Sequence, residues 1–388
     1  MIHIHPFPAR MAPEIALKGL DSLPADYSIL DPMSGSGMVI GTASKLGLEA
    51  IGYDLDPLAC LISKVNGTPV DPKKAEEACA ELVWRANKLD IDENDLLWVD
   101  SETRDYIHFW FAPSQRKQLA ALSYLLNSNP FLKSKELINL LKVAVSRLIV
   151  TKEPKASLAR DTAHSRPHRT ISENDFDVLA TLPGSLKHVL KALRPSSIKT
   201  NAKTYRGDAR RMGRVRDESI DRIVTSPPYL NAIDYMRGHR LSLVWLGFSV
   251  GELRKIRSRS VGAEIVSGHR ISESMHDLLA KLPAEIDDRK RRMLVKYHYD
   301  LCGLLKEAHR VLRKDRQATY VIGNSNIKGH EIMNSDMLVD AATSAGFVNV
   351  SRSVREIPEN RRYMPLINSG TSSLAKRMRT EHVITFAK

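Results

Sequence analysis

Short apolar runs bounded by turn-forming residues alternate along this chain with longer segments of helical periodicity. The runs are rich in β-branched and aromatic residues, which predicts buried strands at 27–30, 49–53, 223–225, 318–322, 347–350 and 382–386. Apolar positions recurring every three or four residues predict helices over 13–20, 73–88, 115–126, 137–150, 295–312 and 336–345. The apolar stretch 241–248 predicts a further buried helix. Strands and helices thus form two halves, separated by a long helical region, 72–200.

The first strand leads into a glycine-rich turn, Asp31-Pro32-Met33-Ser34-Gly35-Ser36-Gly37, and a helix follows. Strand, glycine-rich turn and helix is a nucleotide-binding arrangement, because glycines let the backbone pass close to a ligand. The third glycine of the dinucleotide fingerprint is missing, and no Gly-Lys-Ser/Thr follows. Neither an NAD site nor a phosphate-binding loop therefore fits this turn well.

The second strand ends in the acidic segment Asp54-Leu55-Asp56-Pro57. Asp54 lies about 20 residues beyond the glycines, the spacing at which an acidic residue holds ribose hydroxyls. The alternative is that Asp54 and Asp56 only form a turn. Their combination with the glycine turn at this spacing argues against that alternative.

A stiff loop, Ser226-Pro227-Pro228-Tyr229, ends the strand at 223–225. Two prolines cannot continue a sheet ladder, and the residue before a proline is extended. The loop therefore lies at the carboxyl edge of a strand, where open α/β sheets place their ligands. A proline-rich turn without function is the alternative.

The residue types of this loop suit methylation of an exocyclic amino group. Such a nitrogen is a poor nucleophile, because its lone pair is conjugated into the base. Hydrogen bonds from its N–H groups to Ser226 and to the Pro227 carbonyl would localise that lone pair, and Tyr229 offers a stacking surface for an extruded base. No cysteine follows a proline, which disfavours covalent attack on cytosine C5.

Taken together, these motifs resemble the S-adenosylmethionine-dependent DNA amino-methyltransferases with an SPPY loop, which are typically N4-cytosine-specific. HPFPARMAPE resembles motif X, DPMSGSG resembles motif I, YDLDP resembles motif II, and Ser226–Tyr229 resembles the catalytic motif IV. Gly207-Asp208-Ala209-Arg210 resembles the motif whose acid reaches the adenine of the cofactor. The order of motifs is X, I, II, then IV.

The resemblance implies a Rossmann-like class I methyltransferase fold: α/β, with a mostly parallel seven-stranded sheet and helical insertions. It implies S-adenosylmethionine as cofactor. The residues expected to bind it are Phe7, Pro8, Arg10, Asp31, Pro32, Ser34, Gly35, Gly37, Asp54, Leu55 and Asp208. The residues expected in catalysis are Ser226, Pro227, Pro228 and Tyr229.

Charge points to a polyanionic partner, since the net charge is +13 and the pI is near 9.6. Basic residues gather at the end of the 72–200 region and again in 251–297. From these segments and a later polar loop we expect the contacts to double-stranded DNA to include Arg160, Arg166, His168, Arg169, Arg254, Arg257, Arg259 and Arg361. Solvated loops are the alternative for these segments.

The remaining sequence features indicate the cellular compartment and the division of the chain into domains. Three scattered cysteines, Cys60, Cys79 and Cys302, have no metal-ligand spacing, so we expect no structural metal and a reducing cytoplasm. The resemblance implies that this cytoplasm is prokaryotic and that the protein lies near the nucleoid. No apolar run is long enough to span a bilayer. We expect 1–71, 201–250 and 296–388 to form the methyltransferase domain, with 72–200 and 251–295 as DNA-facing insertions.

The sequence therefore predicts methyl transfer from S-adenosylmethionine to cytosine N4 in DNA, by base flipping and direct displacement. Adenine N6 is the first alternative, because Ser226 only favours cytosine. An RNA methyltransferase, or a nucleic-acid-binding module with a degenerate cofactor site, are the others. A cognate restriction endonuclease is a candidate partner.

Overall fold

The computed structural model describes residues 3–7, 11–128, 131–230, 234–261, 273–280, 282–283, 286–328, 330–357 and 380–388. Among the predicted site residues, Pro8, Arg10 and Arg361 lie outside the described residues. No helix in the described ranges is long and apolar enough to cross a membrane.

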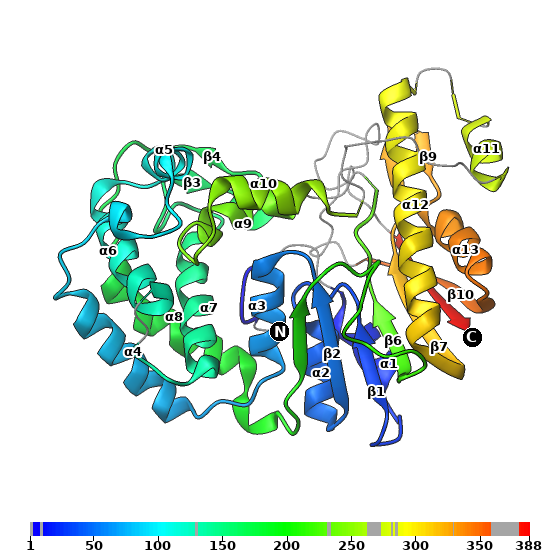
Figure 1. Cartoon of the computed structure of the whole chain (residues 1–388), viewed down its shortest axis with the longest axis horizontal. Coiled ribbons are helices and arrows are strands. Elements are labelled where there is room, and N and C mark those ends of the chain that lie inside the picture. Colours follow the sequence, from blue (N-terminus) through cyan, green and yellow to red (C-terminus); the bar gives the residue numbers. More distant parts are fainter. Residues whose placement is uncertain are drawn as a thin grey trace.

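A seven-stranded sheet forms the centre of the molecule (Figure 1). Its order is β10–β11–β7–β6–β1–β2–β5, and only β11 runs antiparallel to its neighbours. The strands are β1 (Ser28–Asp31), β2 (Glu49–Asp54), β5 (Lys203–Arg206), β6 (Ile220–Thr225), β7 (Leu312–Ile322), β10 (Val348–Glu356) and β11 (Thr380–Ala387). This mostly parallel sheet confirms the predicted Rossmann-like fold class.

Helices cover both faces of the sheet, and neighbouring residues of β1 show why its sequence is continuously apolar. Ile29 packs toward α1 (Pro13–Leu20) and α2 (Met38–Leu46), whereas Leu30 packs in the cluster that contains α12 (Asp288–Val311) and α13 (Asn334–Ser344). Successive strand side chains point to opposite faces, so a strand covered on both sides must be apolar at each position. Both residues are fully buried.

A second lobe of helices lies beside the β5 edge of the sheet (Figure 1). It shares one apolar core with α3 (Pro57–Asn66), through Leu58 and Ile62. Its elements are α4 (Pro72–Ala86), α5 (Ser101–Trp110), α6 (Pro113–Ser123), the π-helical turn Tyr124–Ser128, α7 (Lys135–Ile149), the short strands β3 (Ala159–Arg160) and β4 (His168–Arg169), α8 (Val178–Leu193), α9 (Tyr235–Leu243) and α10 (Val250–Ser258). The helix α11 (Glu273–Ala280) and the hairpin β8 (Ser325–Ile327) and β9 (His330–Ile332) belong to the sheet side.

Three local predictions differ from the structure. The helix expected at 241–248 is α9, which begins at Tyr235 and ends at Leu243, and its apolar continuation turns back to bury Trp245. The edge strand β5 was not predicted, because its four residues, Lys-Thr-Tyr-Arg, are half exposed and carry no apolar run. The helix α12 begins at Asp288, so it crosses the boundary drawn at 295.

Candidate active site at the carboxyl ends of the sheet

The glycine turn connects β1 to α2 with two residues in the left-handed region. Gly35 has φ 47° and Gly37 has φ 72°, where side chains are disfavoured. A Cβ on Gly37 would lie 2.5 Å from the Cα of Ser63 in α3. Glycine is therefore required at 37 both for the turn and for the close approach of two helices.

Asp54, at the end of β2, joins that strand to the glycine turn. Its carboxylate accepts hydrogen bonds from the backbone N–H of Gly35 at 2.8 Å and of Asp56 at 2.9 Å. Burial raises the pKa of Asp54 to about 7, and the nearby charge of Asp56 adds to the effect. The carboxyl group is thus fixed beside the turn with part of its accepting capacity left for a ligand.

Asp31 joins the glycine turn to the strand that carries the SPPY loop. The hydroxyl of Thr225, the last residue of β6, donates to the Asp31 carboxylate at 2.7 Å, and the N–H of Met33 donates to the same oxygen at 3.2 Å. Burial raises the pKa of Asp31 to about 7, although the Thr225 hydrogen bond acts against it. The two predicted motifs, 194 residues apart, therefore meet at adjacent strand ends.

Aromatic side chains cover the same edge. The rings of Phe7 and Tyr235 stack with centroids 5.4 Å apart, and the ring of His239 lies 5.1 Å from Phe7. Phe7 also lies beside Gly35. Nδ1 of the fully buried His239 pairs with the carboxylate of Asp56. His239 was missed by sequence reasoning, and the signal available was its helical spacing of four from Tyr235.

The Ser226-Pro-Pro-Tyr229 loop is fixed by several long-range hydrogen bonds. The hydroxyl of Ser226 donates to the carbonyl of Val321 in β7 at 2.9 Å. The phenol of Tyr297 in α12 donates to the Pro228 carbonyl at 2.9 Å, and Ser325 donates to the carbonyl of Leu230. The loop is therefore preorganised, and the proton of Ser226 is already used inside the protein.

Tyr229 points toward β11. Its hydroxyl donates to Glu381 at 3.3 Å, and burial raises its pKa well above the ordinary value, with the charge of Glu381 contributing. Its ring is half buried against the core on the α12 side of the sheet.

Asp208 follows β5 and belongs to a partly buried charge network. Arg210 donates to both of its carboxylate oxygens, at 2.9 and 2.7 Å, and also pairs with Asp300 of α12. Lys296 donates to Asp300 at 2.7 Å. Burial acts to raise the pKa of Asp208, but the hydrogen bonds from Arg210 outweigh it and hold that pKa below its ordinary value. Asp208 is thus ionised and fixed in position. The backbone N–H of Gly207 also donates to the carbonyl of Asp54 at 2.9 Å.

The structure groups the expected DNA-contacting residues in two places on the helical lobe. Arg160, Arg166, His168 and Arg169 are exposed on and between β3 and β4, where Arg160 pairs with Glu153 at 3.0 Å. Arg254, Arg257 and Arg259 are exposed on and just after α10, where Arg254 pairs with Glu102 and Arg257 with Asp234.

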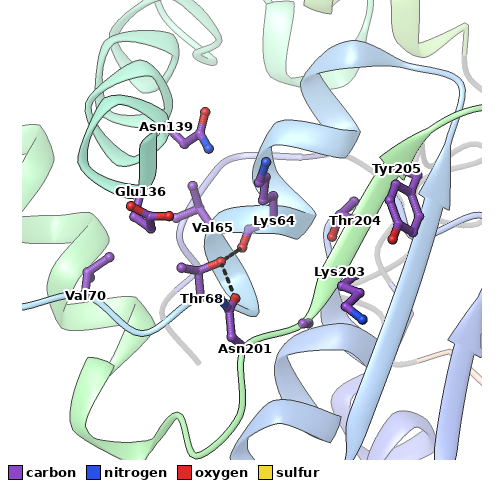
Figure 2. Close-up of a pocket in the computed structure, with 11 residues that line it drawn as sticks. Lys64, Val65, Thr68, Val70, Glu136, Asn139, Asn201, Lys203, Thr204 and Tyr205 are labelled. Atoms are coloured by element: carbon purple, nitrogen blue, oxygen red, sulfur yellow. Dashed lines mark hydrogen bonds between the residues drawn. The ribbon is translucent and has the colours of Figure 1, made fainter. Parts of the chain in front are cut away.

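A cavity of about 210 Å³ lies away from these strand ends (Figure 2). It sits between α3, α7 and β5, and no predicted site residue lines it. Its wall is held by Thr68, whose hydroxyl donates to the carbonyl of Lys64 at 2.7 Å and lies 3.4 Å from Asn201 Oδ1.

Sequence comparisons relate the chain to Type II methyltransferases. No family model matches it. It is 22% identical to the Type II methyltransferase M.MvaI from Kocuria varians, over 95% of this chain and 86% of that protein. It is 25% identical to M.BsoBI from Geobacillus stearothermophilus, over 63% of this chain and 52% of that protein. The chain is thus similar to Type II methyltransferases over most of its length.

Solved structures give weaker likenesses. A SAM-dependent methyltransferase from Methanosarcina mazei aligns at 10% identity over 98% of this chain and 99% of that chain, with a TM-score of 0.37. A DNA modification methylase described as putative, from Thermus thermophilus and in complex with S-adenosyl-L-methionine, aligns at 14% identity over 47% of this chain and 53% of that one, with a TM-score of 0.24.

Proposed function

We propose that this chain transfers a methyl group from S-adenosylmethionine to an exocyclic amine of a base in DNA, with cytosine N4 preferred over adenine N6. The observation that carries the proposal is the junction of Thr225 with Asp31, which sets the SPPY loop beside the glycine turn. An amine held by the loop would thereby face a ligand held by the turn. Similarity to Type II methyltransferases over 95% of the chain supports the same reaction.

The residues around the glycine turn fit a cofactor of this kind. The hydroxyl of Ser34 and Nε2 of His239 are buried without a hydrogen-bond partner in the described part of the chain. Such groups are costly unless a ligand satisfies them. Asp31 and Asp54, each with a pKa raised to about 7, would both gain from a positively charged ligand. When bound, S-adenosylmethionine supplies an electrophilic methyl group on a positively charged sulfur.

We assign the individual cofactor contacts from the roles that the motif resemblance implies. Asp54 would accept hydrogen bonds from ribose hydroxyls, and Leu55 would pack against the adenine. Asp208, held ionised by Arg210, would accept from the adenine amine. Phe7 would cover the methionine end from its position over Gly35. Together these residues would fix the donor relative to the SPPY loop.

Ser226 is placed to act as a hydrogen-bond acceptor. Because its proton is donated to Val321, its lone pairs are left to accept an N–H of the target amine. Pro228 has its carbonyl occupied by Tyr297, whereas Pro227 has no carbonyl partner among the described residues. Ser226 and the Pro227 carbonyl would together orient the amine and localise its lone pair. The amine becomes acidic once alkylated, so its proton is lost to water.

DNA would reach this loop as an extruded base stacked on Tyr229, with the exposed arginines of β3–β4 and α10 on the phosphate backbone. A cognate restriction endonuclease is a candidate partner for an enzyme of this function. Methylation of adenine N6, or of an amine in RNA, would need the same kind of pocket. Product analysis must therefore distinguish these reactions from methylation of cytosine N4 in DNA.

The test is direct identification of the product. The purified chain is incubated with mixed-sequence genomic DNA, or with total RNA, and isotopically labelled S-adenosylmethionine. Digestion to nucleosides and mass spectrometry should then show labelled N4-methylcytosine in DNA. Labelled N6-methyladenine would correct the base, and label confined to RNA would correct the substrate. Cofactor binding with no methyl transfer to either would overturn the proposal.

A further inference from the structure

A cavity of about 380 Å³ opens on the helical lobe, and none of the residues of the glycine turn or the SPPY loop lines it. Three segments line it: α5, the loop between β3 and β4, and α9. The lining residues are Tyr106, Trp110, Arg166, Pro167, Arg237 and Arg240. The cavity is thus lined by two aromatic rings and three guanidinium groups. Among the described residues, no carboxylate lines it. Asp234, whose carboxylate lies 3.3 Å from the Arg237 guanidinium, is outside this lining.

The chemistry of this lining selects an anionic, planar ligand. Arg240 lies over the ring of Tyr106 at 4.9 Å, and its Nε is buried without a hydrogen-bond partner in the described chain. Burial raises the pKa of Tyr106 to about 12, although Arg240 acts against it, so the phenol is neutral. The arginines would repel a cation and would be desolvated by a purely apolar ligand. A ring that stacks and a phosphate that pairs with guanidinium groups satisfy both parts of the lining.

Further groups of the same kind extend from the cavity. Phe109 is 51% exposed, and its ring packs edge-on against Trp110 at 4.8 Å. Arg169 lies over the same Phe109 ring at 5.4 Å. Aromatic and basic side chains thus continue from the cavity onto the neighbouring surface, and this combination of residues suits a nucleic acid strand.

The helix α9 connects this cavity to the reaction site. It begins a short distance along the chain from the SPPY loop. Its Tyr235 and His239 pack on Phe7, which lies beside Gly35, while its Arg237 and Arg240 line the cavity. A Cβ on Gly238 would lie 2.2 Å from the carbonyl oxygen of Thr162, which shows how closely α9 packs on the loop between β3 and β4. The cavity thus has a fixed position relative to the catalytic loop.

We propose that this cavity binds one nucleotide of the DNA substrate other than the target, with its base stacked on Trp110 and its phosphate held by Arg166 and Arg237. This inference rests on the proposed function for its ligand. A free mononucleotide shares the same chemistry, and the experiment below distinguishes that source from the DNA strand.

The test compares two cavity variants with matched exposed residues on α4 of the same lobe. Trp110→Ala is matched by Trp84→Ala, whose ring is 53% exposed, and Arg237→Ala by Arg85→Ala. DNA affinity is measured by fluorescence anisotropy on a labelled duplex, alongside cofactor affinity and thermal midpoint. We expect Trp110→Ala to weaken DNA binding by about tenfold or more, and Arg237→Ala to lower the salt-dependence slope by roughly 0.9. The α4 variants should bind DNA like the parent protein.

Each outcome of these measurements either supports or overturns the proposal. DNA affinity of both cavity variants within about twofold of their α4 controls would overturn the proposal, even if the parent protein methylates DNA. Should Trp110→Ala not fold, Arg237→Ala decides alone, because Arg237 is exposed. Deoxycytidine monophosphate that quenches tryptophan fluorescence in the parent protein but not in Trp110→Ala, without competition from DNA, would identify a free nucleotide as the ligand and would also overturn the proposal. A parent protein that binds DNA through this cavity yet transfers no methyl group would count against the proposed function only.

Discussion

At the scale of single residues, Ser226 and Tyr229 have separable expected roles. Ser226→Ala should lower the single-turnover methylation rate by about 10²–10³-fold while sparing cofactor and DNA affinity, because its acceptor bond strengthens as the amine attacks. The control is Ser172→Ala, because Ser172 is an exposed serine in the segment after β4 and not in the SPPY loop. A parent-like rate in Ser226→Ala would remove the central assignment.

Tyr229→Ala should instead raise the Michaelis constant for DNA, since stacking also holds the base before reaction and contributes roughly 1–3 kcal/mol. Its partner Glu381 keeps an ion pair with Arg355 at 3.1 Å, so the variant should fold. Tyr229→Phe retains the ring and is expected to keep a parent-like constant. Equal constants in the Ala and Phe variants would argue that Tyr229 only packs.

Asp54 should govern cofactor affinity and its pH dependence. Asp54→Ala is expected to cost about 2–3 kcal/mol in cofactor binding by calorimetry, with DNA binding nearly intact, because charge-assisted hydrogen bonds are removed. Since ionised Asp54 is the better acceptor, parent affinity should rise as the pH increases through about 7, and the variant should show less of that rise. Unchanged cofactor affinity in Asp54→Ala would mean that Asp54 only stabilises the turn.

The raised pKa of Asp54 makes the stability of the folded protein change with pH in the opposite direction to cofactor affinity. The folded state favours protonated Asp54, so this stabilisation is present below the ordinary pKa of 3.8 and is lost as the pH rises through about 7. Asp54→Asn should therefore show a flatter unfolding free energy across that window in denaturant titrations.

At the scale of elements, the packing of α9 on the loop between β3 and β4 depends on one glycine. Gly238→Ala would place a methyl group 2.2 Å from a backbone carbonyl, so we expect a loss of about 1–3 kcal/mol in unfolding free energy. Gly251→Ala in α10 meets only the Ser249 hydroxyl, at 3.9 Å, and should be neutral or stabilising. Equal thermal midpoints for the two variants would contradict this account of the junction.

Most elements follow from the sequence because their local pattern is strong. The buried strands β1, β2 and β6 and the helices α1, α4 and α7 match their predicted positions within a few residues. Two of the exceptions have physical causes. The edge strand β5 is held by pairing with β2 rather than by apolar residues, and α9 ends where its apolar continuation folds back into the core.

At the scale of the whole molecule, part of the net charge of +13 comes from exposed arginines at the proposed nucleic acid contacts. Changing Arg160, Arg166 and Arg169 together to Gln should weaken DNA binding and reduce the log–log salt slope by roughly 0.9 for each phosphate that is no longer neutralised. Three exposed arginines elsewhere, Arg85, Arg211 and Arg216, form a charge-matched control. If both triple variants weaken binding equally, net charge rather than this surface attracts DNA.

The sequence by itself determined the fold class and the motif-bearing strand ends, because turn chemistry and strand periodicity are local properties. It placed Gly35, Asp54 and Ser226 at ends of parallel strands, and parallel strands present those ends at one edge. Only the tertiary structure decided which side chains meet there. The bond from Thr225 to Asp31, the Arg210 bridge between Asp208 and Asp300, and the stack of Phe7 on Tyr235 all join segments far apart in sequence. Such contacts depend on how helices pack over the sheet, and no local pattern records that packing.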